Sequence, residues 1–171
     1  MDLMDFDQPT LYYDDPVSPE VEALLKEASA LYGEDGAEAA LLRAYFLAPE
    51  QLVVLVALYR YYFYQHRLED ALIVADRAMA VAGRRLNLPG DWRHLQADHV
   101  GHAVLRSMGL LRFYLMVLKA AGYINMRLER FDTGHAMLVK LTELDSHDRL
   151  GGKALLDVIT AAVAARIEEA A

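Results

Sequence analysis

The sequence predicts an all-α protein, a right-handed stack of antiparallel helix hairpins with about seven or eight helices, the last of which is a cap. Small residues recur at a fixed spacing: Ala71 lies 34 positions after Ala37, and Ala78 lies 34 positions after Ala44. Apolar residues recur at helical intervals, and Pro or Gly separates the segments. A fixed period of this kind is typical of stacked helical hairpins. The chain has 171 residues, of which 55% are hydrophobic, enough to fill one core.

Residues 1–17 form an acidic N-terminal arm that matches no helix pattern. The arm holds five Asp and no Lys or Arg, and residues 1–50 together hold 12 acidic and 2 basic residues, a net charge of -10. Two interpretations stay open: a loose terminus, or a segment whose aromatic residues dock against the body. A further hypothesis is that the arm competes with an acidic ligand for a basic groove, on the same molecule or on a neighbouring one.

Two complete helix–turn–helix units are predicted after the arm, at about residues 18–51 and 52–85. Ser18, Pro19 and Glu20 provide an N-cap hydroxyl, a proline at the first helical position and an acid in the first turn. The first helix should end near Gly33 and Gly36. Three more helices are expected over about 37–47, 51–65 and 68–85.

A divergent third unit is predicted at about 115–148. It follows the second unit by 63 residues rather than 34, which leaves 29 inserted residues over about 86–114. Asp91 is a candidate N-cap for a helix over about 92–108 within this insertion. Helices over about 110–128 and 131–144 should follow, and a capping helix over about 153–170 should cover the end of the stack.

The second helix of each unit carries small residues at matching positions, namely Ala37 and Ala44, Ala71 and Ala78, and Gly134. This pattern resembles the tetratricopeptide-repeat family of 34-residue helical hairpins, with two clear units and one divergent unit. The resemblance implies a single α-solenoid domain over residues 18–171, with close helix crossings at the small residues. The run from Arg60 to Arg67 also resembles small repeat proteins encoded near nitrogen-fixation genes, which implies an association with nitrogen fixation.

The resemblance also implies a binding surface, because the first helix of each unit lines a concave groove in that family. The matching positions with cationic or aromatic side chains are Lys26, Arg60, Phe63, Tyr64, Lys119, Tyr123 and Arg127. Cations pair with carboxylates, and aromatic rings supply apolar contact area. We therefore expect a protein–protein interaction module, an adaptor, scaffold or chaperone-like protein, that binds an extended acidic peptide or partner. The alternative is that these cations only keep helix surfaces in water.

The aromatic run over residues 59–64 is expected to divide between the core and the groove, because consecutive positions point around a helix. Stacking on nucleic-acid bases is the weaker interpretation, since the chain carries a net charge of -8.

Two other functions are compatible with the sequence. The apolar segment 107–118 offers a route to self-association as a homodimer or larger structural oligomer. The residues His94, Asp98 and His102, spaced four apart, are candidate metal ligands on one helical stripe. Surface histidines are the favoured interpretation, because three ligands spread over two helical turns rarely reach one ion. No cofactor is therefore predicted.

Several classes of protein are disfavoured by what the sequence lacks. It contains no Cys, which excludes disulfides and thiolate chemistry, and no phosphate-binding Gly loop or His-Glu-x-x-His pair, so no enzyme activity is predicted. Its long apolar runs are interrupted by charges such as Arg60 and Arg112, so no membrane span is predicted. The sequence does not begin with a basic segment followed by an apolar one, so the chain is expected to be cytoplasmic. It is also expected not to bind nucleic acid.

Overall fold

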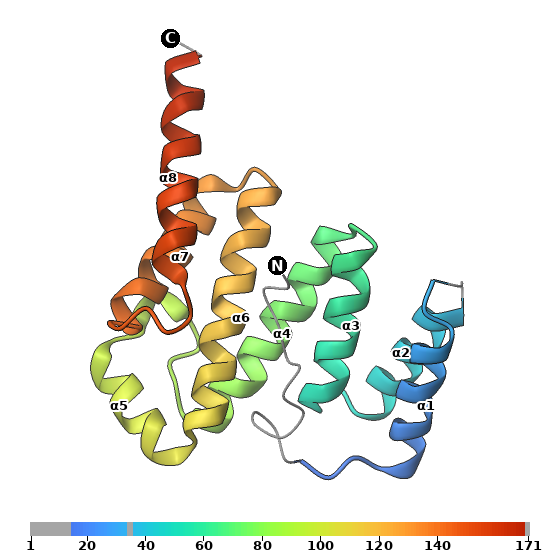
Figure 1. Ribbon diagram of the computed structural model, residues 1–171. Helices are drawn as coiled ribbons and strands as arrows, with labels where there is room; N and C mark the ends of the chain where they lie inside the picture. Colours follow the sequence, from blue (N-terminus) through green and yellow to red (C-terminus); the bar gives the residue numbers. More distant parts are fainter. Residues whose placement is uncertain (1–14, 34–35, 170–171) are drawn as a thin grey trace.

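The computed structural model describes residues 15–33 and 36–169, with side chains in the last helix as far as Ala162. These residues form eight α-helices and one 3-10 turn, and they contain no strand (Figure 1). The elements are α1 (Pro19–Ala30), α2 (Gly36–Leu47), α3 (Leu52–Tyr64), α4 (Leu68–Leu86), η1 (Trp92–His94), α5 (Ala97–Arg106), α6 (Met108–Arg127), α7 (Phe131–Leu144) and α8 (Gly152–Glu169). The predicted all-α fold is confirmed.

Three hairpins account for most of the packing. Helix α1 packs against α2, α3 against α4, and α6 against α7, while α2–α3 and α4–α6 contacts join one hairpin to the next. Figure 1 shows this order from α1 to α7, with α5 beside one end of α6 and α8 extending past α7. The right-handed sense of the stack and the resemblance to tetratricopeptide repeats stay predictions.

Local capping signals explain where several helices begin and end. The Ser18 hydroxyl accepts a hydrogen bond from the Val21 backbone N–H at 3.3 Å, as predicted for the start of α1. Helix α4 ends at Leu86, the following Asn87 has a left-handed φ of 58°, and the Leu88 N–H donates back to the Gly83 carbonyl at 2.9 Å. Asparagine tolerates this conformation better than most residues, so the chain leaves α4 abruptly and enters the insertion.

The predicted continuous helix over about 92–108 is wrong. Asp91 does act as an N-cap, but it caps only η1, and Leu95 and Gln96 are extended before α5 begins at Ala97. Leu95 is buried, and its carbonyl accepts a hydrogen bond from Lys140 of α7 at 3.3 Å. A contact with a helix 45 residues away therefore overrides the local helical pattern.

The expected close helix crossings are confirmed. Ala37, Ala44, Ala71 and Ala78 are all buried. Helices α6 and α7 also approach closely, because a Cβ atom built on Gly134 would lie 2.8 Å from the Gly122 carbonyl oxygen. Only glycine fits at this crossing without a backbone shift.

The longest helices are α6 with 20 residues and α4 with 19, and both carry charged residues. Among residues 15–33 and 36–169, none of the helices combines the length with the apolar character that crossing a membrane requires.

Candidate partner-binding site

A hollow of about 750 Å³ lies between the first two hairpins, and we call it the α1–α3 hollow. Its α3 wall is a single helical stripe, because Val53, Ala57, Arg60 and Tyr64 follow one another at intervals of four, three and four residues. The full lining is Leu25, Ala28, Ser29, Tyr32, Leu41, Val53, Val56, Ala57, Arg60 and Tyr64. Two of the seven predicted binding residues, Arg60 and Tyr64, thus line one hollow.

The α1–α3 hollow combines an apolar floor with a polar rim. Its floor consists of aliphatic side chains such as Val53 and Val56, and Arg60 supplies a cation beside them. The rings of Tyr32 and Tyr64 are about half exposed, and Tyr32 packs edge-on against Tyr61 with ring centroids 6.2 Å apart. A carboxylate that entered this hollow would meet a guanidinium in partly dry surroundings, where charge-assisted hydrogen bonds are strongest.

The other predicted aromatic positions form a cluster between α3 and α6. Phe63 stacks on Tyr59 at 5.8 Å, and it contacts Tyr64 at 5.7 Å and Tyr123 at 6.4 Å. Arg127 donates a hydrogen bond to the Tyr123 hydroxyl at 3.1 Å. The cluster therefore connects Tyr64 to Arg127.

The aromatic run divides as the sequence predicts. Tyr59, Tyr61 and Tyr62 are buried, Phe63 is half-buried, and Tyr64 is 46% exposed. One short run of α3 therefore contributes both to the core and to the rim of the α1–α3 hollow.

Lys26 and Lys119 contact groups outside the α1–α3 hollow. Lys26 is well exposed and pairs with Glu22 on the surface of α1 at 2.7 Å. Lys119 is half-buried and donates a hydrogen bond to the Leu150 carbonyl in the turn before α8. Burial lowers the pKa of Lys119, while the nearby Asp148 and Asp145 act in the opposite direction. Of the four predicted groove cations, Arg60 therefore borders the α1–α3 hollow, and Lys119 anchors the turn before α8.

The candidate metal ligands do not share a helical stripe, so that prediction is wrong. His94 belongs to η1, whereas Asp98 and His102 belong to α5, and the extended residues Leu95 and Gln96 separate the two elements. Throughout the described part of the chain, no three His, Cys, Asp or Glu residues are grouped so that they could hold a metal ion.

The described end of the acidic arm lies near the α2–α3 turn. Gln51 donates hydrogen bonds to the Asp15 and Pro16 carbonyls, and Arg85 of α4 forms an ion pair with Asp15. Neither Asp15 nor Pro16 lines the α1–α3 hollow. Residues 1–14 lie outside the described residues, so competition by the arm stays a prediction.

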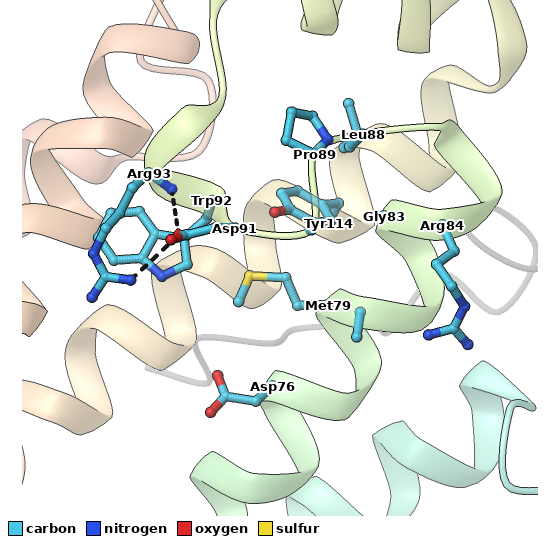
Figure 2. A pocket seen from close by; sticks show the side chains of 12 residues that line it. Asp76, Met79, Gly83, Arg84, Leu88, Pro89, Asp91, Trp92, Arg93 and Tyr114 are labelled. Carbon is cyan, nitrogen blue, oxygen red and sulfur yellow. Dashed lines mark hydrogen bonds and ion pairs between the residues drawn. The ribbon is translucent and has the colours of Figure 1, made fainter.

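Sequence reasoning missed a second hollow, of about 510 Å³, where α4 and α6 meet the insertion (Figure 2). It is lined by Asp76, Met79, Ala80, Gly83, Arg84, Leu88, Pro89, Gly90, Asp91, Trp92, Arg93 and Tyr114. Trp92 is buried with the Arg93 guanidinium 4.5 Å from its ring centroid, and burial raises the pKa of Tyr114. The helix-ending residues Asn87–Gly90 were the signal in the sequence that could have indicated this hollow. A chain that turns away from the end of a helix leaves space beside that helix.

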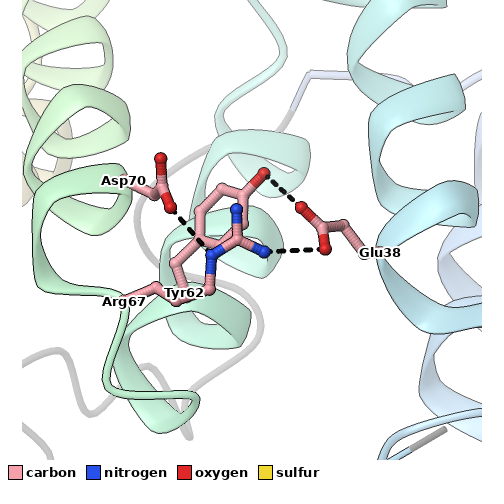
Figure 3. A network of polar contacts seen from close by, with 4 residues as sticks. All are labelled: Glu38, Tyr62, Arg67 and Asp70. Carbon is pink, nitrogen blue, oxygen red and sulfur yellow. Dashed lines mark hydrogen bonds and ion pairs between the residues drawn. The ribbon is translucent and has the colours of Figure 1, made fainter. Parts of the chain in front are cut away.

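A polar network joins the first two hairpins (Figure 3). Glu38 of α2 accepts hydrogen bonds from the Tyr62 hydroxyl at 3.1 Å and from Arg67 at 2.7 Å, and Arg67 also donates to Asp70 at 2.8 Å. Burial and the adjacent Glu38 carboxylate raise the pKa of Tyr62 to about 12. Since the α1–α3 hollow lies between these hairpins, contacts that fix their relative positions also fix its width.

Comparison with known proteins places the chain in a family. It is 53% identical over 159 residues to an "uncharacterized 19.8 kDa protein in nifW 5'region" of Azotobacter chroococcum mcd 1, and the match covers 93% of this chain and 89% of that protein. The chain belongs to the same family. The nifW 5' location in that protein's name agrees with the resemblance noted for the run from Arg60 to Arg67. No family model and no solved structure matches the chain.

Proposed function

We propose that this chain is a non-catalytic protein–protein interaction module, an adaptor, scaffold or chaperone-like protein, that holds an extended acidic segment of a partner in the α1–α3 hollow. The observation that carries this proposal is the combination found there: about 750 Å³ of space, an aliphatic floor, and Arg60 among the lining residues.

Each part of the α1–α3 hollow has a role in holding such a segment. Alternate side chains of an extended peptide point to opposite sides, so some can enter the aliphatic floor while others face solvent. Arg60 is placed to pair with a carboxylate. The exposed rings of Tyr32 and Tyr64 give large contact areas at a low cost in side-chain entropy.

We place the partner among cytoplasmic proteins that take part in nitrogen fixation. This part of the proposal is supported by the relative from Azotobacter chroococcum mcd 1, whose name locates it in the nifW 5' region. The cytoplasmic location is also supported by the charged residues that interrupt the apolar runs of this sequence.

The proposal can be tested with two pools of short, fluorescently labelled random peptides, one rich in Asp and Glu and the other rich in Lys and Arg. Fluorescence anisotropy should show binding of the acidic pool only. Arg60→Glu should weaken that binding by about tenfold to a hundredfold, the range expected for loss of a charge-assisted pair.

Lys26→Glu and Arg127→Glu are matched controls, because they make the same charge change at positions that do not line the α1–α3 hollow. Both should retain most of the affinity. Equal losses in all three variants would show that only the overall charge matters, and binding unaffected by Arg60→Glu would refute the proposed site.

A further inference from the structure

Helix α2 is apolar on its outer side as well as on its inner side. Its inner side is buried against the stack, through Ala37, Ala40, Leu41 and Ala44. Its outer side carries the exposed residues Leu42, Phe46 and Leu47, of which Phe46 is 85% exposed. Apolar side chains grouped on one side of a helix normally pack against another surface, and among the described residues these three side chains stay exposed.

The exposed apolar surface continues from α2 onto α4. Leu42 borders a hollow of about 330 Å³ that it shares with Phe46 and Leu47. It also borders a second hollow, of about 180 Å³, that is shared with Ile73 of α4, which is 67% exposed. We call Leu42, Phe46, Leu47 and Ile73 the outer band. Contiguous exposed apolar surface with a polar rim marks an interaction site.

The charges beside the outer band indicate what covers it. Glu20 and Arg43 both line the 330 Å³ hollow. Within the described residues, neither of these side chains has an ion pair or a hydrogen bond, whereas Asp70 and Arg77 at the neighbouring hollow are paired with Arg67 and Glu50. The outer band therefore has one unpaired acid and one unpaired base at its edge.

We propose that the outer band is the interface of a homodimer, in which α2 of one copy packs against α2 of a second copy across a two-fold axis. A two-fold contact uses the same patch on both copies, so the patch must be complementary to itself. With the axis between Glu20 and Arg43, each Arg43 faces the Glu20 of the other copy. A uniformly acidic partner would pair with Arg43 but be repelled by Glu20.

This surface is separate from the site proposed for partner binding. No residue that lines the 330 or 180 Å³ hollow also lines the α1–α3 hollow. The dimer therefore leaves both copies of the α1–α3 hollow open. Two open sites on one particle raise the avidity for a partner with two acidic segments.

Sedimentation velocity tests the apolar part of the interface. The wild-type chain should sediment with twice the 19.2 kDa mass of one chain and should dissociate on dilution. Phe46→Glu should be monomeric with an unchanged circular dichroism spectrum, because its side chain is exposed in the single chain. Val158→Glu is the matched control: it alters an apolar residue of α8 that is 67% exposed and distant from α2, and it should leave the dimer intact (Figure 1).

Charge reversal tests the two-fold arrangement. Glu20→Arg and Arg43→Glu should each weaken the dimer, because like charges then face each other, and the double variant should regain it. An equimolar mixture of the two single variants should form a heterodimer, since one copy then presents two cations and the other two acids.

Several results would overturn the proposal. A wild-type chain that stays monomeric at every concentration would show that a different protein, and not a second copy, covers the outer band. A dimer that survives Phe46→Glu, or that Val158→Glu breaks instead, would place the interface elsewhere. Charge variants that recover neither in the double variant nor in the mixture would exclude the two-fold pairing.

Discussion

The two ends of the predicted groove differ, although the same residue types mark both. Between α1 and α3 the chain leaves a hollow of about 750 Å³ beside Arg60. Between α3 and α6 the side chains fill the space, because Phe63 contacts Tyr123 and Arg127 bonds to the Tyr123 hydroxyl. The comparison teaches that cations and aromatic rings at matching helical positions can border a hollow at one end and fill the contact between two helices at the other.

Two features of the chain bring later segments close to the α6 end of the predicted groove. Gly122 and Gly134 let α7 approach α6 closely. The turn before α8 then lies where its Leu150 carbonyl accepts a hydrogen bond from Lys119. At the α1–α3 end, the residues that follow α3 continue into α4, which packs against α3.

The largest effect is expected from Gly134→Leu, which tests the close packing of the filled end. The side chain would overlap the Gly122 carbonyl and Met126, and the free energy of unfolding should fall by roughly 1–3 kcal/mol. Chemical denaturation measures this loss. Gly101→Ala in α5 is the control, since nothing lies within 4 Å of its new Cβ atom, and it should not destabilise the protein. Equal stability in both variants would show that the α6–α7 crossing is not close.

Filling the open end should abolish most peptide binding and leave stability nearly unchanged. Ala57→Trp places an indole in the α1–α3 hollow, and the affinity for the acidic peptide pool should fall by about tenfold, which corresponds to about 1.4 kcal/mol. Ala80→Trp makes the same change in the second hollow and is the matched control in the anisotropy assay. A greater loss with Ala80→Trp would move the site to the second hollow.

A smaller effect is expected from Lys119→Met, which separates a binding role from an anchoring role. The variant loses the hydrogen bond to Leu150, so stability should fall by about 1 kcal/mol or less. Hydrogen exchange should become faster in the turn before α8, while binding of acidic peptides is retained. Lost peptide binding with unchanged exchange would make Lys119 a groove cation after all.

The smallest effect concerns the network that joins the two hairpins, and it depends on pH. The pKa of Tyr62 is raised from 10.0 to about 12 in the folded chain, so the unfolded chain ionises at lower pH. Stability should therefore fall as the pH rises from 10.0 toward about 12, because the folded state keeps the neutral phenol. Tyr62→Phe cannot ionise and should show a shallower fall in alkaline denaturation. If stability fell as steeply with pH in this variant as in the wild type, Tyr62 would be excluded as the source of the pH dependence.

Much of the fold could be predicted because its signals are local. The Ser18 cap, the apolar periodicity and the small residues at 34-residue spacing each act within one helix or one hairpin. The break at Leu95 and Gln96 could not be predicted, because it depends on burial of Leu95 beside α7. The local pattern favours a helix there, but the contact with α7 holds these residues in an extended conformation.

The candidate site was predictable only in part, for the same reason. Arg60 and Tyr64 lie on the stripe of α3 that lines the α1–α3 hollow, and the helical period alone indicates that they share a face. Lys119 fits the same pattern, but its partner is the Leu150 carbonyl, 31 residues later in the chain. The apolar residues of segment 107–118, expected to drive self-association, are mostly buried in the core, including Leu111, Phe113 and Leu115. Phe46 on α2 and Ile73 on α4 are among the large apolar residues of the described chain that stay exposed, as Met108 does within that segment.

Trp92 gives the molecule a built-in optical reporter at one place. It is the single tryptophan of the chain, and it is buried beside α4 and α6, at the second hollow. Its emission therefore follows the loosening of the insertion, whereas far-ultraviolet circular dichroism follows all eight helices of the described residues at once. Melting curves from the two signals coincide when the hairpins unfold as one cooperative unit and separate when the insertion opens first.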